Sequence, residues 1–461
     1  MVKESTYDKK NVLVLGLAKS GYYAAKLLHT LGAKITVNDA KDLKDDSDAR
    51  ELEQLGIKVI SGGHPTDLMD EAFDLVVKNP GIPYDNPVIK EALDKKLPII
   101  TEVEIATSLM EAPIIALTGS NGKTTTTSII HDMLSQERTS GTAYAIGNIG
   151  VPASQVALEL TANDDAILEL SSFQLMGTPT IKPEIAVITN LFSAHLDYHG
   201  SQAAYEDAKM NMIRNQTTED ITIYNKDQAH LEELVRANTK AELLPFSREK
   251  YLENGTSVKD GKIYFKGEFV AEVSDIFIQG MHNLENMLAA ISVAKLKGVS
   301  NEVIQTVMRN FHGVKHRTQF VTEYNERIFY NDSKATNIEA TENALAGFSQ
   351  PVILLAGGLD RGNSFDRLIP IFKDHVKALV AFGQTADRMV EIAKKAGISK
   401  IKKMNDVSKA VPAAYALSEP GDIILLSPAA ASWDQYENFE VRGDTFISAV
   451  QNLKDIHKGN E

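Results

Sequence analysis

The 461-residue sequence contains no cysteine. This absence excludes disulfide bonds, thiolate metal sites and a cysteine nucleophile together. The sequence also lacks any run of about eighteen or more apolar residues, and its first ten residues are polar, so neither a membrane span nor a signal peptide is expected. We therefore expect a cytoplasmic protein.

Basic residues are scarce as well, with 48 Lys and Arg against 62 Asp and Glu and a net charge of -14. Nucleic-acid surfaces are usually basic, so a general nucleic-acid partner is not expected. We predict small-molecule ligands, and neither a membrane nor a protein partner. The composition is that of an ordinary globular protein, with 43% apolar and 24% charged residues, and the length favours roughly two to four domains.

The most informative segment spans residues 112–127. An apolar strand at 114–117 is followed by Thr-Gly-Ser-Asn-Gly-Lys-Thr-Thr and the start of a helix. Glycines allow backbone N–H groups to turn toward a polyphosphate, Lys123 supplies an ammonium group, and Thr124 supplies a hydroxyl for the accompanying Mg²⁺. The usual pattern has a glycine where Leu117 stands, so this is a shortened phosphate loop that begins at Thr118.

An earlier glycine-rich turn lies at residues 16–21, between a strand at 10–15 and a helix that ends near Gly32. A second strand (34–37) follows, with Asp39 at its end, as in dinucleotide-binding folds. The middle glycine of that fingerprint is replaced by Ala18. We therefore predict a nucleotide-binding fold of altered specificity, while a nicotinamide site and a purely structural turn stay open. Asp39 either accepts from a uracil or ribose donor or simply ends the strand.

Three further residues of the central region could take part in catalysis or metal binding. Glu169 ends an apolar strand (165–170), and a lone carboxylate is costly to bury unless it is paired or binds a metal, so we favour Mg²⁺. His195 follows the next strand (185–189) and is either a metal ligand or a hydrogen-bonded loop residue. Lys209 lies in a helix at 203–213 and would by itself be interpreted as a solvated residue.

The following segments argue about the class of nucleotide. A strand at 221–224 leads into Asn-Lys-Asp-Gln, and Gln228 stands where a regulatory GTPase needs an acid. Residues 251–273 predict β-hairpins. Gly280 then opens a helix, which we expect to be amphipathic over 287–296, with amides such as that of Asn283 placed to contact a base or ribose.

The C-terminal third contains apolar strands at 327–330, 352–356 and 422–426, each followed by a polar or glycine-rich loop. Their alternation with helical segments predicts a parallel α/β sheet, whose ligands gather at the carboxyl ends of the strands.

With these motifs in place, the whole chain resembles the Mur ligase family. The family motifs are the phosphate loop from Thr118, Glu169 before Ser-Ser-Phe-Gln, His195-Leu-Asp, Lys209, His282-Asn283, His316-Arg317 and Asp332-Ser-Lys-Ala-Thr-Asn. The segment Ser-Pro-Ala-Ala-Ala-Ser-Trp-Asp-Gln-Tyr-Glu-Asn-Phe-Glu-Val-Arg-Gly from Ser427 resembles the branch that adds D-glutamate, and the Asp-Asn-Pro-Arg signature of the diamino-acid branch is absent. Three positions depart from many relatives, namely Ala194, Ala430 and Arg361.

The resemblance implies an α/β protein of three domains: a Rossmann-like UDP-sugar-binding domain (1–102), a central P-loop ATPase-like domain (103–313) and a C-terminal Rossmann-like parallel-sheet domain that binds the amino acid (314–461). It implies a ligase of peptidoglycan precursor synthesis. ATP would phosphorylate the carboxylate of UDP-N-acetylmuramoyl-L-alanine, and the amine of D-glutamate would attack the acyl phosphate.

The resemblance also implies roles for individual residues. The ATP-binding residues would be Gly119, Ser120, Asn121, Gly122, Lys123, Thr124, Thr125, Asn283, Arg317 and Asp332. The UDP-sugar would be bound by Lys19, Ser20, Asp39, Asn79, Gly81 and Asn148. The D-glutamate would be bound by Lys334, Thr336, Arg361, Ser432 and Phe439. Two Mg²⁺ ions would be held by Thr124, Glu169, His195 and Lys209, the last as a carbamate, and the catalytic residues would be Lys123, Lys209, His195 and Glu169.

Three alternatives remain open at this point. Another amino-acid ligase of the same family, including the folylpolyglutamate type, would share the ATP site. A P-loop regulatory switch is disfavoured by Gln228, and a nicotinamide enzyme would depend on residues 10–39 alone and is disfavoured by Ala18.

Overall fold

The computed structural model describes residues 6–136, 138–278, 280–362 and 364–458. The chain divides into two compact units, Met1–Asn310 and Phe311–Glu461, and each is described by itself below. Within the described residues, every helix is too short or too polar to cross a membrane.

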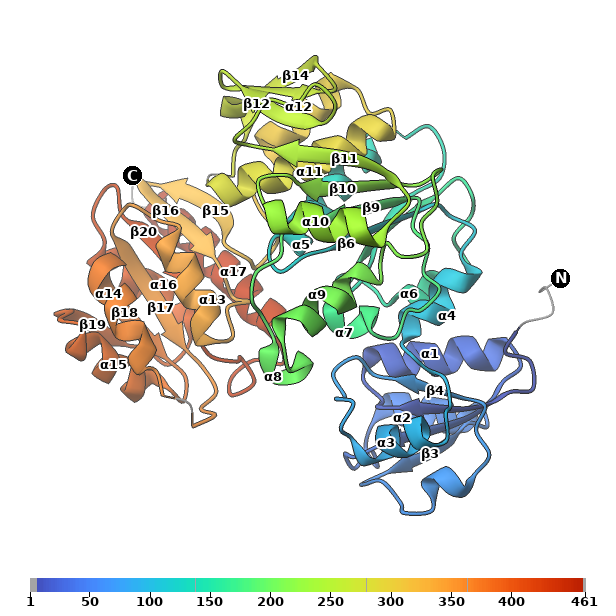
Figure 1. Cartoon of the computed structure of the whole chain (residues 1–461). Helices are drawn as coiled ribbons and strands as arrows, with labels where there is room; N and C mark the ends of the chain where they lie inside the picture. Colours follow the sequence, from blue (N-terminus) through green and yellow to red (C-terminus); the bar gives the residue numbers. More distant parts are fainter. Residues whose placement is uncertain (1–5, 137, 279, 363, 459–461) are drawn as a thin grey trace. The chain divides into compact units, whose positions relative to one another are not determined.

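The first unit begins with a five-stranded sheet and its helices, drawn in blue in Figure 1. The strands are β1 (Asn11–Leu15), β2 (Lys34–Asp39), β3 (Lys58–Ser61), β4 (Leu75–Lys78) and β5 (Ile99–Ile100). The helices are α1 (Lys19–Thr30), α2 (Ser47–Gln54), the 3-10 turn η1 (Leu68–Asp70), α3 (Pro87–Asp94) and α4 (Glu102–Leu109). All pairs are parallel, in the order β3-β2-β1-β4-β5. The strand order reverses at β1, with β2 and β3 on one side of it and β4 and β5 on the other. The loops after β1 and β4 therefore diverge, and the space between them is the position where such sheets bind ligands.

The turn from β1 into α1 depends on two glycines. Gly16 has a φ of 93°, which is strained for other residues. A Cβ at Gly21 would overlap the carbonyl oxygen of Gly16. The expected βα turn is therefore confirmed, with α1 held close to the strand it follows.

The second sheet of the first unit has nine strands. They are β6 (Ile114–Thr118), β7 (Ala143–Gly147), β8 (Asp165–Glu169), β9 (Ile185–Ile188), β10 (Ile221–Asn225), β11 (Glu242–Ser247), β12 (Thr256–Lys259), β13 (Lys262–Phe265) and β14 (Glu268–Glu272). The helices are α5 (Lys123–Gln136), α6 (Ala153–Val156), α7 (Ser172–Leu175), α8 (Leu196–His199), α9 (Gln202–Met210), α10 (Ala229–Asn238), the 3-10 turn η2 (Val273–Asp275), α11 (Met281–Leu296) and α12 (Asn301–Asn310).

The strand order is β14-β13-β12-β11-β10-β9-β6-β8-β7. The pairs from β7 to β12 are parallel, and β12, β13 and β14 form the antiparallel hairpins expected from the sequence. Strand β6 lies between β8 and β9, so the segments after these three strands share one edge of the sheet. A single apolar cluster contains residues of both sheets, for example Val12 and Ala116.

Helix α11 differs from the expectation. It packs against α5 and the strands around β11, and every residue from Asn286 to Ala294 is buried. The prediction of an amphipathic helix is therefore wrong, because α11 is covered on more than one side.

The second unit contains one sheet of six strands. They are β15 (Gln319–Tyr324), β16 (Arg327–Asn331), β17 (Val352–Gly357), β18 (Val376–Phe382), β19 (Lys400–Lys403) and β20 (Ile423–Leu426). The helices are α13 (Ile338–Ala346), the 3-10 turn η3 (Asp366–Leu368), α14 (Ile369–His375), α15 (Ala386–Lys395), α16 (Val407–Leu417) and α17 (Phe439–Lys458).

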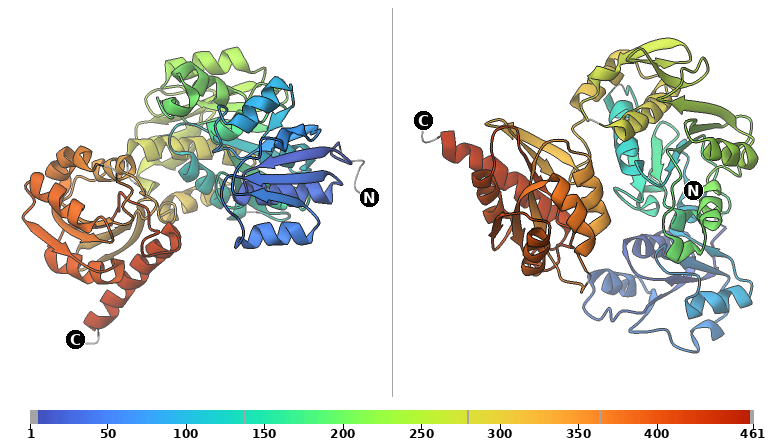
Figure 2. Two further views of the ribbon diagram at one scale, coloured as in Figure 1. Left: turned by 90° about the horizontal axis from the view of Figure 1, so that it is seen from below. Right: turned by 60° about the vertical axis from the view of Figure 1, so that its left-hand side comes forward.

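The order β15-β16-β20-β17-β18-β19 is parallel apart from the β15–β16 pair at one edge. The long helix α17, drawn in red in Figure 2, packs with α16 against one face of this sheet, through Phe446, Val450 and Leu453. The expected α/β class with predominantly parallel sheets is confirmed.

Candidate active site

The phosphate loop follows β6 and leads directly into α5. Gly119 and Gly122 have φ values of 153° and 81°. A Cβ at Gly119 would overlap the hydroxyl of Thr189, and a Cβ at Gly122 would overlap the side-chain oxygen of Asn286. Both glycines are therefore required by close neighbours as well as by their backbone conformation.

Lys123 folds back over this loop. Its Nζ donates to the carbonyl oxygens of Gly119 (2.8 Å) and Ser120 (3.0 Å). The lysine is the first residue of α5, where the N–H groups of the first turn have no partner within the helix and the helix dipole is positive. The ammonium group of Lys123 and the N-terminus of α5 therefore lie next to each other, and both attract the negative charge of a polyphosphate.

The loop is also held by the segment after β9. The N–H of Ser120 donates to the carbonyl of Asn190 (2.9 Å), and the N–H of Asn121 donates to its side-chain oxygen (2.9 Å). The hydroxyls of Ser120 and Tyr205 are 2.8 Å apart. Asn190 was not predicted as a site residue. It directly follows an apolar strand, and the same kind of position drew attention to Glu169 and His195.

Glu169 lies at the carboxyl end of β8, beside the phosphate loop strand, and is 1% exposed. Its Oε1 accepts from the Asn148 amide (2.7 Å), whereas its buried Oε2 has no hydrogen-bond partner among the described residues. A buried carboxylate oxygen without a donor is costly unless a cation binds it. Asn148, expected to contact the UDP-sugar, thus orients the carboxylate expected to bind metal.

Lys209 is not the solvated residue that its helix suggests, because it is 1% exposed. Its Nζ donates to Gly119 O (2.9 Å) and to the Thr118 hydroxyl (3.2 Å), and lies 4.9 Å from the ring centre of Tyr205. Burial, and then the charge of Lys123, lower the pKa of Lys209 well below its usual value, against an opposing effect of Glu169. Burial thus favours the neutral form of this amine over its charged form.

His195 is exposed and adopts a left-handed conformation (φ 53°) immediately before α8. Its ring centre is 4.9 Å from that of Phe173. Among the described residues, no three His, Asp or Glu side chains gather as a metal cluster. Any metal at this edge therefore needs ligands of other kinds beside Glu169 and His195.

The residues expected to bind the UDP-sugar lie mainly after β1, β2 and β4. Asp39 accepts from the N–H groups of Leu17 (2.7 Å) and Lys41 (2.8 Å), so its carboxylate fixes the two loops around it. Asn79 donates to the Ser20 hydroxyl (3.1 Å) and accepts from the N–H of Gly81 (3.1 Å). Lys19 is exposed beside them.

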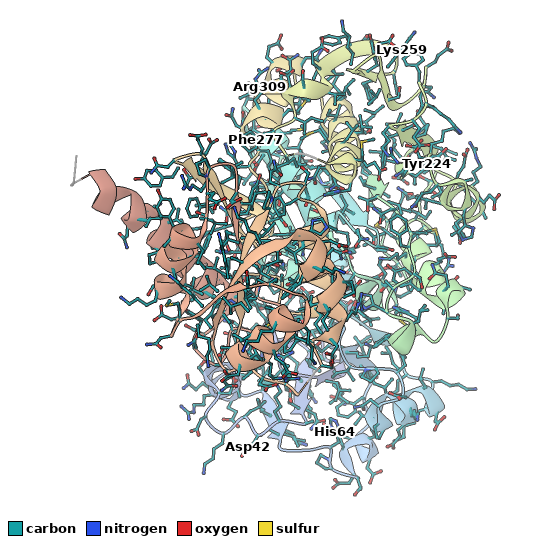
Figure 3. All side chains as sticks on the ribbon, turned by 90° about the vertical axis from the view of Figure 1, so that its left-hand side faces the viewer. Asp42, His64, Tyr224, Lys259, Phe277 and Arg309 are labelled. Atoms are coloured by element: carbon teal, nitrogen blue, oxygen red, sulfur yellow. The ribbon has the colours of Figure 1, made fainter. Side chains whose placement is uncertain are left out.

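The same edge of the first sheet extends to Asp42 and His64, which follow β2 and β3 and are labelled in Figure 3. The His64 ring lies 2.6 Å from the side-chain oxygen of the buried Asn38. The structure brings Ser20, Asn79 and Gly81 together, and Asp39 ends the adjacent strand β2.

In the second unit, Thr336 and Arg361 line a cavity of about 340 Å³ together with residues 429–431. The Arg361 guanidinium lies 5.0 Å from the ring centre of the exposed Trp433. The remaining residues expected to bind D-glutamate lie outside this lining. Lys334 lies over the ring of Phe439 (5.5 Å), and Ser432 is buried.

The residues expected to bind ATP are divided between the units, with Asn283 in the first and Arg317 and Asp332 in the second. Asp332 accepts from the Ser427 hydroxyl (2.8 Å) and from the N–H of Thr318 (3.0 Å). Burial raises the pKa of Asp332 to about 7, against the lowering effect of these donors.

Arg442 is a site-building residue that the sequence argument missed. It is fully buried and donates to the carbonyls of Ser333 (2.8 Å) and Ala430 (3.0 Å), so it joins the loops after β16 and β20. Burial lowers its pKa to about 10. The only sequence signal was its place in the motif that begins at Ser427.

Three family models match successive parts of the chain. They are "Mur ligase MurD-like, N-terminal domain" at residues 10–101, "Mur ligase middle domain" at 117–294 and "Mur ligase, glutamate ligase domain" at 316–430. The UDP-N-acetylmuramoylalanine--D-glutamate ligase of Enterococcus faecalis is 57% identical over 456 residues, covering 99% of both chains. The enzyme of the same name from Listeria innocua is 54% identical and covers 98% of this chain and 99% of its own.

Solved structures share the fold at low identity. The UDP-N-acetylmuramate-alanine ligase MurC of Thermotoga maritima has a TM-score of 0.55 at 19% identity and covers 96% of this chain and all of its own. MurF of the same organism, solved in complex with ADP, has a TM-score of 0.54 at 16% identity and covers 98% of both chains. These similarities bear on the fold alone.

Proposed function

The chain belongs to the Mur ligase family, and on this premise we propose that it joins D-glutamate to UDP-N-acetylmuramoyl-L-alanine at the expense of ATP. Relatives that carry this activity in their names match it over nearly their whole length. The family assignment leaves the regulatory-switch and nicotinamide alternatives without support. We retain the expected domains, 1–102, 103–313 and 314–461, and the cytoplasmic location as parts of this proposal.

One observation carries the proposal. One edge of one sheet holds the phosphate loop, the buried amine of Lys209 and a buried carboxylate oxygen of Glu169. Among the described residues, that oxygen has no hydrogen-bond partner. A protein that only bound a nucleotide would need the phosphate loop but neither the buried carboxylate nor the buried lysine. A buried carboxylate and a buried lysine beside it are expected where a phosphoryl group is transferred.

The proposed reaction has two steps. The carboxylate of the L-alanine end attacks the γ-phosphorus of ATP, and the bond to the β,γ-bridging oxygen breaks, which gives an acyl phosphate and ADP. The neutral amine of D-glutamate then attacks the acyl carbon, inorganic phosphate leaves, and the nitrogen loses a proton. Lys123 would neutralise charge on the transferred phosphoryl group, and the α5 N-terminus would bind the remaining phosphates.

The chemistry of the residues at this edge fits Mg²⁺. The open oxygen of Glu169 and the Thr124 hydroxyl are the hard oxygen donors that this ion prefers, and His195 would supply a further ligand. When bound, Mg²⁺ would neutralise phosphate charge and align the β- and γ-oxygens. Two ions remain our prediction.

Lys209 would complete this set as a carbamate. Its burial supports a neutral amine, which is the form that reacts with CO₂ and releases a proton when the carbamate forms. The carbamate carries one negative charge shared by two oxygens, whereas a protonated lysine would add a second positive charge near Lys123, so Coulomb's law favours the carbamate beside Mg²⁺.

Substrate recognition is proposed for the two remaining groups. Lys19, Ser20, Asp39, Asn79, Gly81 and Asn148 would bind the UDP-sugar. Lys334, Thr336, Arg361, Ser432 and Phe439 would bind D-glutamate, and the cavity lined by Thr336 and Arg361 supports that assignment.

Phosphate release tests the proposal. ATP and UDP-N-acetylmuramoyl-L-alanine are mixed with the enzyme and with D-glutamate, L-glutamate, L-lysine or meso-diaminopimelate in turn. We expect turnover with D-glutamate and little with the others. Equal rates with L-lysine would replace the D-glutamate assignment with another branch of the family.

A further inference from the structure

Lys78 is a buried lysine to which the reaction above gives no role. It ends β4, directly before the loop that carries Asn79 and Gly81, and is 1% exposed. Within the described residues, no ion pair joins it to a carboxylate. Burial lowers its pKa to about 8, so it is largely protonated at neutral pH. A buried cation of this kind is costly, and an apolar side chain of similar length would avoid the cost.

The contacts of Lys78 show what the cation does. Its Nζ donates to the carbonyl oxygens of Ile82 (2.7 Å), Pro80 (3.2 Å) and Asn79 (3.3 Å). Three carbonyls of one short loop therefore point inward at a single ammonium group. This arrangement fixes the backbone of residues 79–82 on the buried side of the loop. On its other side, Asn79 donates to the Ser20 hydroxyl and Gly81 remains exposed.

A second element meets the same ammonium group. The Tyr198 hydroxyl lies 3.2 Å from Lys78 Nζ, and it also contacts the carbonyls of Ile82 (3.0 Å) and Pro80 (3.3 Å). Tyr198 belongs to α8, which begins immediately after His195. Its ring packs edge-on against Phe173 (4.6 Å), and Phe173 also contacts the His195 ring (4.9 Å). An unbroken set of contacts thus runs from the loop after β4 to the segment bearing His195.

We propose that Lys78, acting with Tyr198, is a positioning residue that holds the loop of residues 79–82 in the shape that binds the uridine nucleotide and ties this loop to the segment bearing His195. The inference rests on the proposed function, because it takes the UDP-sugar as the ligand of this loop. Within the described residues, the hydrogen bonds of Lys78 join it to the loop of residues 79–82 and to Tyr198, and none joins it to the phosphate loop. Its effect is therefore expected on one substrate rather than on all three.

The test is Lys78→Met, which keeps the length of the side chain and removes the charge. We expect the dissociation constant for UDP-N-acetylmuramoyl-L-alanine, and for UDP alone, to rise about tenfold, since several hydrogen bonds that shape the loop are lost. The KM values for ATP and D-glutamate should stay within about twofold of wild type. A merely structural role would instead change all three or only the melting temperature.

Tyr198→Phe provides a milder second variant that keeps the ring packing. Its dissociation constant for the nucleotide should rise about threefold, and the effect of the double variant should be smaller than the product of the two separate effects, because both groups act on the same carbonyls. Lys26→Met is the matched control. Lys26 also contacts a tyrosine hydroxyl (Tyr22, 3.1 Å) in the same domain, but on α1 and paired with Glu51, and its loss should leave nucleotide binding unchanged.

Calorimetric titration with UDP separates the two possible failures. If the wild-type protein binds neither UDP nor the UDP-sugar, the proposed function fails. If the wild type binds and Lys78→Met binds equally well, the positioning role is wrong. If Lys78→Met unfolds, Tyr198→Phe decides, and unchanged nucleotide affinity in that variant contradicts the proposal.

Discussion

The loop after β4 and the loop after β6 each have a backbone carbonyl that accepts a hydrogen bond from a buried lysine, yet the two lysines have different surroundings. Lys78 and Lys209 are each 1% exposed, each donates to at least one backbone carbonyl, and each lies about 5 Å from a tyrosine ring. Lys78 is surrounded by neutral acceptors. Lys209 has a second lysine and a glutamate near it.

We propose that this difference separates a structural cation, Lys78, from a reactive amine, Lys209. Burial alone lowers the pKa of Lys78 to about 8, whereas burial, and then the charge of Lys123, lower the pKa of Lys209 well below its usual value. A lysine that stays protonated can gather carbonyls. A lysine whose surroundings favour the neutral form can react with an electrophile such as CO₂.

The largest expected effect is at Lys209. Lys209→Met should lower turnover by about a thousandfold or more, since no carbamate can form, while ADP binding and the melting temperature are retained. Lys209→Arg should not restore activity, because arginine keeps its positive charge. Phosphate-release assays and mass spectrometry of the wild-type protein for the added CO₂ check this. An active Lys209→Met enzyme would make the two lysines equivalent.

The sequence predicted the β6 loop far better than the β4 loop. Gly119, Gly122 and Lys123 have a spacing that only one kind of chemistry requires, so the motif was sufficient. Lys78 lay in a turn-rich segment without a motif, and its contact with Tyr198 joins residues 120 positions apart. The burial of Lys209 also depends on long-range contacts, here with Thr118 and Gly119. The helical pattern alone predicted a solvated lysine, which was wrong. Resemblance to a family supplied its role.

A second prediction concerns pH and Lys78. The unfolded chain holds a proton on this lysine up to the ordinary lysine pKa of 10.5, whereas the folded protein releases it near 8. Between these values the unfolded state binds more protons, so the free energy of unfolding should rise with pH, by about 3 kcal/mol from this residue.

Denaturant titrations of wild type and Lys78→Met at several pH values between 7 and 10.5 check this window. The rise should be smaller in the variant than in the wild type by about 3 kcal/mol, and the rise that remains comes from other groups such as Lys209. An identical pH dependence in both proteins would mean that Lys78 is not desolvated as the structure indicates. Lys26→Met, whose lysine is partly exposed, should behave as wild type in the same titrations.

A third prediction contrasts the glycines of the two loops. Gly122→Ala should weaken ATP binding about a hundredfold, because the new Cβ would overlap Asn286 and force the loop to shift. Gly81→Ala is the matched control, since the nearest atom to its new Cβ would be 3.6 Å away. That variant should keep the wild-type ATP affinity and melting temperature. Equal ATP affinities for both variants would contradict the geometry of the β6 loop.

The smallest effect is expected from an exposed cation, Arg361. A guanidinium binds a carboxylate through two parallel hydrogen bonds, and Arg361→Ala should raise the KM for D-glutamate about thirtyfold while the KM for ATP changes little. Arg327→Ala is the control. Arg327 also stacks on an aromatic ring (Tyr415, 5.3 Å), but it lies at the amino end of β16 and should leave both KM values unchanged. An unchanged D-glutamate KM in Arg361→Ala would move the contact to Lys334.

Identification of the product tests the central claim most directly. The enzyme is incubated with ATP, UDP-N-acetylmuramoyl-L-alanine and an equimolar mixture of unlabelled D-glutamate and isotope-labelled L-glutamate, and the nucleotide product is analysed by mass spectrometry. We predict a product heavier than the substrate by one unlabelled glutamate residue, formed together with one ADP and one phosphate. A labelled product, or ATP hydrolysis without any new amide, would contradict the assignment of this chain as a D-glutamate ligase.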